Sequence, residues 1–391
     1  MQLLPRLCLI WPVLACGLVY PPAMFAEALP ADGTMLVYFG TYTGARSQGI
    51  YVSRFDPATG QLTAPELAVA TASPSFLALH PSRRFLYSAG ETSILNGKRV
   101  GAVAAFSMNA KTGRLTLLNR QSSGGEGPCH VAVDRMGKCL LVANYGNGSI
   151  AALPIQADGA LAAPTTVIQH QGSSVNPARQ AGPHAHFIIP DPANQFALVC
   201  DLGLDQVLTY RLHPPQAALV PNDPPFASVK PGSGPRHLVF HPSGRFVFLI
   251  SEIGSTLTAF AYDAKRGALK ELQTVSTLPE TFAGNSSCAE VQVHPSGKFV
   301  YGSNRGHDSI AVFGFDARKG KLTFVQHQAT QGKTPRHFAI DPTGQWLLAE
   351  NQDSDSIVIF RVDSKTGRLS PTGRTVSVGA PVCAVFVPTS S

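Results

Sequence analysis

Histidine, arginine and glutamate recur at one position of a phrase that the sequence repeats. The phrase is an apolar run that ends in a His/Asp-Pro turn. Counting back four residues from the turn (five in the third copy) gives a titratable side chain in five copies, namely His130, His186, His237, Glu290 and His337. Arginine stands directly before the histidine in two copies, as Arg236 and Arg336. Imidazole can take up a proton near neutral pH, and guanidinium matches a carboxylate or phosphate. These residues predict proton transfer beside a bound anion.

A second polar set closes the apolar run that follows each turn. Its last positions hold Glu91, Tyr145, Leu202, Glu252, Arg305 and Gln352. One residue earlier stand Asn144, Asp201, Ser251, Asn304 and Asn351. Two runs joined by a tight turn are antiparallel, so the start of the first strand and the end of the second lie at the same end of the sheet. We therefore expect His, Arg, Glu and Asn side chains to gather at one end of the fold.

Other roles for these histidines stay open at the level of sequence. A repeated histidine can donate to the backbone of the neighbouring repeat, although this explains the arginines poorly, because arginine is rarely buried without a partner. Histidines alone could also bind a metal, but these belong to different repeats around a wide channel, and we predict no metal site. The turn histidines His80, His241 and His294 alternate with aspartates and are predicted to bond local backbone.

The elements that position these residues are β-strands. The turns recur every 47 to 57 residues in six copies. Between them lies a second phrase, such as SIAVFGFDARKGKLT, which indicates a strand, an Asp-x-x-x-Gly turn and another strand. Each repeat thus supplies four strands and shows no helical periodicity, which is typical of a β-propeller blade.

The two ends of the chain indicate a seventh blade. PVCAVFVP near the C-terminus matches a first strand with no second, and LVYFGTYTG near the N-terminus matches a second strand with no first. Residues 29–391 number 363, or about 52 for each of seven blades. We predict an all-β, seven-bladed propeller with four-stranded antiparallel blades, closed by pairing the terminal strands in one blade. Closure removes exposed sheet edges, so a monomer is expected.

Residues 1–28 are predicted to be an export signal, followed by one propeller domain over 29–391. The apolar stretch at 7–20 is about 14 residues long, too short to span a membrane. A small-x-small cleavage site ends at Ala28. Alternatively, the preceding Val-Leu-Ala makes Cys16 a lipoprotein anchor. Both interpretations predict an exported protein, periplasmic or extracellular.

Composition narrows the class of partner. Hydrophobic residues make up 44% and charged residues 14% of the 391 residues, enough for a large core, which excludes disorder. The net charge is +7, yet no basic run is longer than Arg83-Arg84, whereas nucleic-acid binders gather their basic residues. We predict a small anionic ligand and no nucleic acid. The cysteines after position 28 show no CxxC spacing and are interpreted as buried structural residues: Cys129, Cys139, Cys200, Cys288 and Cys383.

Several phrases together resemble a known family, the seven-bladed propeller lactonases, which include 6-phosphogluconolactonase and the fungal carboxy-muconate lactonizing enzymes. The matching phrases cover nearly the whole chain after residue 28. They are PHAHFIIPDP with CDLGLDQV, GSGPRHLVFHPSGRF, AEVQVHPSGKFVYGSNRGHDSI, and GKTPRHFAIDPTG with ENQDSDSI.

The resemblance implies cofactor-free chemistry on a sugar lactone at the propeller mouth. By position it implies four catalytic residues, His186, Arg236, Glu252 and Arg305. His184 is the alternative to His186, and His337 departs from the family pattern, in which many relatives carry asparagine. In our hypothesis His186 or Glu252 deprotonates water, and the arginines bind and polarise the substrate. The predicted substrate-binding residues are His130, His184, His237, Glu290, Asn304, Arg336, His337 and Asn351. Two alternatives are a non-catalytic carbohydrate- or protein-binding propeller and a carboxy-muconate cycloisomerase.

Overall fold

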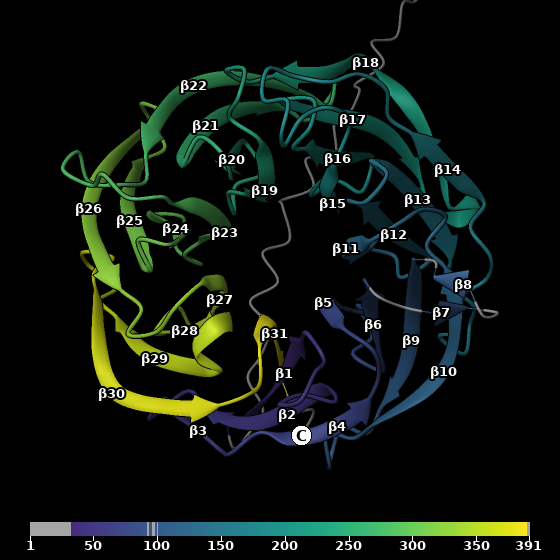
Figure 1. The fold of residues 1–391 in the computed structure, drawn as a ribbon, viewed down its shortest axis with the longest axis horizontal. Helices are drawn as coiled ribbons and strands as arrows, with labels where there is room; N and C mark the ends of the chain where they lie inside the picture. Colours follow the sequence, from purple (N-terminus) through teal and green to yellow (C-terminus); the bar gives the residue numbers. More distant parts are fainter. Residues whose placement is uncertain (1–32, 92–93, 96–97, 100, 389–391) are drawn as a thin grey trace, which may run out of the picture.

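Each copy of the repeated phrase forms the two inner strands of one sheet in the computed structural model. The structure describes residues 33–91, 94–95, 98–99 and 101–388. Seven antiparallel sheets, or blades, surround a central channel, with β5, β11, β15, β19, β23, β27 and β31 innermost (Figure 1). The predicted fold class is confirmed. The export signal and Cys16 lie outside the described residues.

The first four blades follow the chain from its N-terminal side. Blade 1 contains β31 (Pro381–Pro388), β1 (Met35–Thr41) and β2 (Gly49–Asp56), and its outer strand is divided into β3 (Gln61–Leu62) and β4 (Glu66–Ala70). Blade 2 contains β5 (Pro74–Leu79), β6 (Phe85–Gly90), β9 (Ala102–Met108) and β10 (Leu115–Ser122). Blade 3 contains β11 (Pro128–Val133), β12 (Cys139–Asn144), β13 (Ser149–Pro154) and β14 (Thr166–Gln169). Blade 4 contains β15 (Ala185–Pro190), β16 (Phe196–Asp201), β17 (Gln206–His213) and β18 (Ala218–Ser228).

Three further blades complete the ring. Blade 5 contains β19 (Pro235–Phe240), β20 (Phe246–Ser251), β21 (Thr256–Asp263) and β22 (Ala268–Ser276). Blade 6 contains β23 (Ser287–Val293), β24 (Phe299–Arg305), β25 (Ser309–Asp316) and β26 (Lys321–Ala329). Blade 7 contains β27 (Pro335–Ile340), β28 (Trp346–Asn351), β29 (Ser356–Val362) and β30 (Leu369–Ser377). The remaining elements are a small ribbon, β7 (Ile94–Leu95) with β8 (Lys98–Arg99), and two 3-10 turns, η1 (Pro214–Gln216) and η2 (Gln352–Ser354).

The ring closes as the terminal phrases predict. β1 and β31 pair antiparallel from Met35 opposite Pro388 to Thr41 opposite Pro381. The two halves of blade 1 thus come from opposite ends of the chain, and Figure 1 shows purple β1 beside yellow β31. This pairing satisfies the backbone edges that an open ring would expose.

Apolar side chains join each blade to the next. Between blades 5 and 6, for example, Phe248 belongs to one buried cluster with Val300 and Phe313. All five described cysteines are free and buried, as expected for small apolar residues. With the strand bodies fixed by this packing, the strand ends at the channel mouth are free to carry polar side chains.

Candidate active site

A β-bulge at the start of most inner strands brings polar side chains to one mouth of the channel. The pairing register shifts by one residue between Pro235 and His237 of β19, which leaves Arg236 as the bulged residue. The same shift leaves six such residues in all: Ser75, Cys129, His186, Arg236, Arg336 and Val382. A bulge bends the strand and re-aims a side chain, a device common beside active sites. These residues form the upper level of the channel.

The bulges correct one part of the sequence alignment. Allowing an extra residue in the third copy aligned His186 with His130, His237 and His337, but Phe187 occupies that position. Phe187 pairs with Cys200 immediately after the bulge, just as His130 pairs with Ala143. His186 is therefore the equivalent of Arg236 and Arg336, and no residue is inserted. Phe187 interrupts the histidines at this position, so an alignment on histidine is displaced by one residue in this copy.

Three arginines converge on the carboxylate of Glu252, which directly follows β20. Arg236 contacts Glu252 Oε2 through Nη1, and Arg305 Nη2 lies 3.0 Å from the same oxygen. Arg179 Nη2 lies 2.6 Å from Oε1. Glu252 and Arg236 are only 5% and 3% exposed, so these charges meet with little water around them. A buried carboxylate needs such partners, because removing an unpaired charge from water is very costly.

His186 joins this cluster as a neutral imidazole. Its Nε2 lies 2.7 Å from Arg236 Nη1. Guanidinium only donates hydrogen bonds, so Nε2 must be the acceptor and the proton must reside on Nδ1, which has no hydrogen-bond partner. Burial, and then the charge of Arg236, hold the pKa of His186 well below its usual value. The neutral form is therefore maintained throughout the physiological range.

The charges of the cluster are equally well defined. Burial alone would raise the pKa of the Glu252 carboxyl, but Arg236 and Arg305 outweigh it and hold this pKa well below its usual range. Burial and the charge of Arg236 lower the pKa of Arg305 to about 9, which leaves its guanidinium protonated at neutral pH. Glu252 is consequently a firmly ionised carboxylate and a weak base.

These side chains surround a cavity of about 250 Å³ at the channel mouth. It is lined by Glu91, Cys129, Tyr145, Arg179, His186, Arg236, Glu252, Arg305 and Arg336. All four predicted catalytic residues are thus brought together, as is Arg336 from the predicted substrate-binding set. The volume lies just below the usual range for drug-sized ligands and suits a small one.

Below the upper level, three predicted residues and Glu350, which was not predicted, form a buried chain that crosses three blades. His237 Nδ1 lies 2.7 Å from Glu290 Oε2, and His337 Nε2 lies 3.7 Å from that oxygen. His337 Nδ1 lies 2.8 Å from Glu350 Oε2. A gap of about 10 Å³, close to the smallest that holds one water, is lined by His237 and His337 together with His186, Arg236 and Arg336 of the cavity wall. We call these four residues the inner chain. They lie in the channel and do not line the cavity.

The inner chain holds protons near neutral pH. Burial raises the pKa of Glu290 to about 7. Burial alone would lower the pKa of His337, but Glu290 and Glu350 outweigh it and raise this pKa. Beside the chain, the His130 ring lies between Phe76 and Phe187, with ring centroids 4.1 and 3.9 Å away. Burial lowers the pKa of His130 well below its usual value, so it packs as a neutral aromatic ring.

Three further residues of the predicted substrate-binding set also lie away from the cavity wall. Asn304 is fully buried and donates to the Thr277 carbonyl at 2.9 Å, and Asn351 donates to that of Thr330 at 3.3 Å. Both asparagines tie a loop to their own blade. His184 bonds the Tyr145 carbonyl through Nδ1 at 2.8 Å and stacks on the Tyr145 ring. Of the pair His184 and His186, the structure brings His186 into the cavity.

Arg179 is a cavity residue that the sequence reasoning missed. It lies in the segment between β14 and β15, outside the repeated phrases, so aligning the repeats could not reveal it. Besides Glu252, it contacts the Tyr145 hydroxyl at 3.2 Å. Tyr145 and Glu91 did appear at the ends of the second strands, but neither was predicted to be functional. Their signal was the repeat position that they share with Glu252.

The turn histidines lie at the opposite face and have a structural role. His241 accepts the Ser243 N–H at Nδ1 and therefore donates through Nε2 to the Gly297 carbonyl of the next blade, 3.0 Å away. His80 and His294 make equivalent contacts with Gly137 and Gly344. They were predicted to bond local backbone; they also link adjacent blades.

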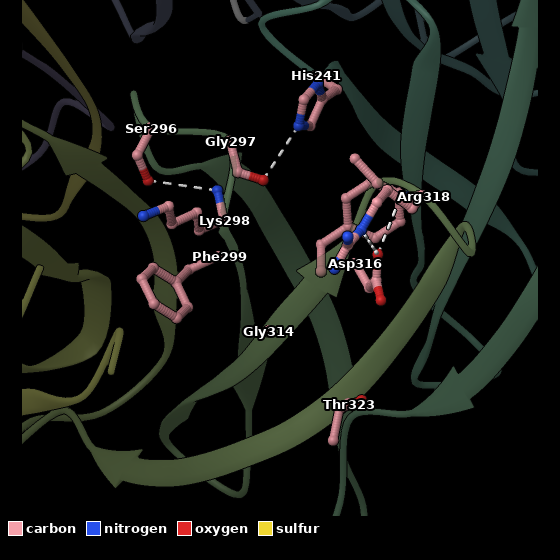
Figure 2. A pocket seen from close by; sticks show the side chains of 11 residues that line it. His241, Ser296, Gly297, Lys298, Phe299, Gly314, Asp316, Arg318 and Thr323 are labelled. Atoms are coloured by element: carbon pink, nitrogen blue, oxygen red, sulfur yellow. Dashed lines mark hydrogen bonds and ion pairs between the residues drawn. The ribbon is translucent and has the colours of Figure 1, made fainter. Parts of the chain in front are cut away.

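A second hollow of about 610 Å³ opens on this opposite face (Figure 2). Two of its titratable side chains, His241 and Asp316, are engaged in hydrogen bonds. His241 bonds Gly297, and the Asp316 carboxylate accepts the Arg318 N–H at 2.9 Å. Within the part of the chain that the structure describes, no three His, Cys, Asp or Glu side chains are grouped to hold a metal ion. The cavity at the mouth is therefore the candidate site.

Comparison with known proteins agrees with this architecture. The family described as "Lactonase, 7-bladed beta-propeller" matches residues 36–386. A 6-phosphogluconolactonase from Bacillus subtilis is 37% identical over 350 residues, which cover 90% of this chain and 97% of that protein. One from Formosa agariphila is 33% identical over 311 residues, covering 78% of this chain and 86% of that protein. The solved structure of a periplasmic gluconolactonase from Pseudomonas aeruginosa is 35% identical, with a TM-score of 0.86 over 91% of this chain and 99% of that chain.

Fold and cavity together define a β-propeller with an arginine-rich site at one mouth of its channel. The chain belongs to the seven-bladed β-propeller lactonase family, and its relatives named 6-phosphogluconolactonase indicate a lactone hydrolase. Among the residues that the structure describes, no helix is long and apolar enough to cross a membrane.

Proposed function

We propose that the protein hydrolyses a small sugar lactone, or its phosphate ester, in the cavity at the mouth. One observation carries the proposal: Arg236 and Arg305 meet the same carboxylate oxygen of Glu252 beside the neutral His186. Further support comes from relatives named 6-phosphogluconolactonase and gluconolactonase. No cofactor takes part in this reaction.

The charge of the cavity favours an anionic substrate. Four arginines and two glutamates line it, so four positive and two negative charges leave a net charge of +2. A carboxylate or phosphate on the substrate would offset this excess in a site with little water, where charges interact strongly. Guanidinium groups also bind such anions through two parallel hydrogen bonds.

The same arginines can stabilise the transition state. Water attack on the lactone carbonyl creates an oxyanion, and preorganised cationic donors beside it lower the barrier. Arg236 and Arg305 supply these donors, and Glu252 holds them in position before the substrate arrives. Because the ion pairs already exist, little reorganisation is needed at the moment of reaction.

The base for this reaction must be neutral imidazole or an accessible carboxylate. Of the two residues first considered, Glu252 is the weaker choice, because three arginines stabilise its ionised form. His186 is neutral, but its Nε2 lone pair accepts the hydrogen bond from Arg236. His186 can take a proton through Nε2 only when that bond is broken.

We further propose that the protein is an exported monomer. The export signal predicted for residues 1–28 supports this location, as does the gluconolactonase from Pseudomonas aeruginosa, which is described as periplasmic. Such a protein would meet sugar or aldonic lactones outside the cytoplasm rather than a phosphorylated cytosolic metabolite. The choice between neutral and phosphorylated lactones therefore needs measurement.

The proposed function is tested by a lactone panel followed with a pH-stat on the protein lacking residues 1–28. The panel contains 6-phosphoglucono-δ-lactone, glucono-δ-lactone and other aldonolactones. We expect hydrolysis well above the spontaneous rate for at least one of them, and a kcat/KM at least tenfold lower in Arg236→Ala. No acceleration on any lactone would overturn the proposal. Saturable binding without turnover would instead identify a binding propeller, and conversion of a carboxy-muconate a cycloisomerase.

A further inference from the structure

We propose that Glu91 is the general base that activates water in this cavity. The assignment rests on the proposed lactonase function and identifies a catalytic residue beyond the four predicted ones. Glu91 directly follows β6, the second strand of blade 2, as Glu252 directly follows β20, the second strand of blade 5. The two carboxylates therefore occupy the same position of two repeats, three blades apart around one mouth, and both line the same cavity.

The two carboxylates differ in their partners. Glu252 contacts Arg179, Arg236 and Arg305, which occupy both of its oxygens. Glu91 makes no ion pair among the described residues, and its Oε2 is buried without a hydrogen-bond partner. A buried carboxylate oxygen without a partner is uncommon, because losing its hydration costs free energy. A carboxylate that makes no ion pair, in the wall of a reaction cavity, is available to receive a proton from a bound water.

Glu91 lies near Tyr42 and Arg336 and is not one of the partners in the arginine cluster around Glu252. The Tyr42 hydroxyl lies close to Glu91: burial, and in addition the charge of Glu91, raise the pKa of Tyr42. The Tyr42 ring in turn carries the Arg336 guanidinium 5.2 Å from its centroid. Arg336 lines the same cavity and interacts electrostatically with both Glu91 and Glu252. Arg336 can attract the anionic part of a substrate into the cavity without forming an ion pair with Glu91.

Glu91 also answers the difficulty with the other two candidates. Glu252 is a weak base in its arginine cluster, and the lone pair of His186 is engaged by Arg236. Two carboxylates in contrasting environments commonly divide the roles of base and electrostatic stabiliser. Here Glu252 positions the arginines that stabilise the oxyanion, and Glu91 accepts the proton from water.

The proposed step balances without a further reactant. Glu91 takes one proton from water while the water oxygen bonds to the lactone carbonyl carbon, and Arg236 and Arg305 stabilise the oxyanion. The bond between the carbonyl carbon and the ring oxygen then breaks. Glu91 returns its proton to the leaving ring oxygen, which becomes the hydroxyl of the open hydroxy acid. The acid releases its own proton to solvent, and Glu91 is again a carboxylate.

The test compares Glu91→Gln with the wild type and with Glu252→Gln on the best lactone of the panel. Glu91→Gln preserves shape and removes the base, so we expect kcat to fall by about 10²- to 10⁴-fold with KM within threefold. We expect Glu252→Gln to raise KM as well, because it releases the arginines. Thermal melting of each variant establishes that the propeller is folded.

Chemical rescue supplies a readout that a structural role would not give. Formate or acetate should restore part of the activity of Glu91→Ala in proportion to its concentration, and should leave the wild type and Arg236→Ala unchanged. A folded Glu91→Gln enzyme that retains kcat within threefold of an active wild type would overturn the assignment of Glu91 alone. Loss of kcat in Glu91→Ala that no small carboxylate restores would also count against it. A wild type inactive on every lactone would overturn the proposed function and this assignment with it.

Discussion

Glu252 shows how a single side chain decides what its neighbours can do. Its two oxygens hold arginines from three different places: Arg236 from an inner strand, Arg305 from the end of a second strand, and Arg179 from a connecting segment. Buried ion pairs offset a large desolvation cost only with good geometry, so each arginine is confined to one position. The arginines differ in exposure, and this difference separates binding from catalysis.

Arg179 is expected to contribute to binding rather than to the chemical step. Its side chain is 42% exposed, whereas that of Arg236 is 4% exposed, so solvent screens its charge more strongly. We expect Arg179→Ala to raise KM about threefold to tenfold, equivalent to roughly 1 kcal/mol, with kcat within twofold. Steady-state kinetics on a phosphorylated and a neutral lactone would measure this, with the larger effect on the anion. Arg179→Lys is the matched control that retains the charge; unchanged KM in Arg179→Ala would contradict the prediction.

Blade-to-blade contacts at the opposite face depend on glycine at defined positions. Gly297 has a φ of +73°, and its carbonyl accepts the His241 hydrogen bond from the preceding blade. A Cβ at this position would overlap the His241 ring. The turn glycine is therefore required twice, once for its backbone conformation and once for the close approach of the histidine.

Gly297→Ala should reduce stability without changing the active site. A non-glycine residue in left-handed backbone costs on the order of 1–3 kcal/mol, and the clash with His241 adds to it. We expect the Tm to fall by several degrees while kcat and KM stay within twofold, because this turn lies at the face opposite the cavity. Differential scanning calorimetry and lactone kinetics would measure both. Gly373→Ala, where a Cβ meets nothing within 4 Å although φ is +73°, separates the backbone cost from the clash. Equal Tm values for wild type and Gly297→Ala would contradict the prediction.

The sequence predicts the elements more completely than it predicts the cavity. Blade count, strand pairing and closure follow from repeated phrases, because each phrase encodes one sheet and its turns. The sequence alignment placed His186 with the wrong residues of the other blades, because a bulge and not an insertion determines which side chain reaches the cavity. Asn304 directs its side chain away from the cavity that Arg305 lines, since successive residues of a strand point to opposite faces. Arg179 lies outside any repeat and meets Glu252 only in the folded ring.

At the scale of the whole molecule, the inner chain connects three blades through titratable groups. Glu290 of β23 faces His237 of β19 and His337 of β27, with Glu350 of β28 behind His337. Arg236 contributes a nearby positive charge. Because these contacts cross blade boundaries near the channel axis, their protonation affects the stability of the ring rather than that of one sheet.

Glu290→Gln should change how stability depends on pH. Burial raises the pKa of Glu290 from 4.5 to about 7, so the folded protein binds more protons than the unfolded chain between these values. Stability from this group is present below pH 4.5 and is lost as pH rises through 7. Raising this pKa from 4.5 to about 7 corresponds to on the order of 3 kcal/mol of unfolding free energy. We expect the unfolding free energy of Glu290→Gln to rise by about this amount relative to the wild type between pH 4.5 and 7.5.

Denaturant unfolding at a series of pH values would measure the difference. Subtracting the unfolding free energy of the variant from that of the wild type cancels the opposing contributions of His130 and His186, whose pKa values are lowered. The exposed Glu280→Gln is the control and should show no pH-dependent difference. Parallel stability curves for Glu290→Gln and wild type would refute the role assigned to Glu290.

One position of the repeat lies at the channel mouth in each of the seven blades. The residues at this position can therefore be changed separately from the residues that form the fold. That position holds Tyr42, Glu91, Tyr145, Leu202, Glu252, Arg305 and Gln352. The buried clusters that join the blades lie along the strand bodies, so most exchanges at the strand ends would not disturb them. A combinatorial library confined to these positions would sample new ligand preferences on an unaltered fold. Substrate range could then diverge in such a protein faster than its architecture.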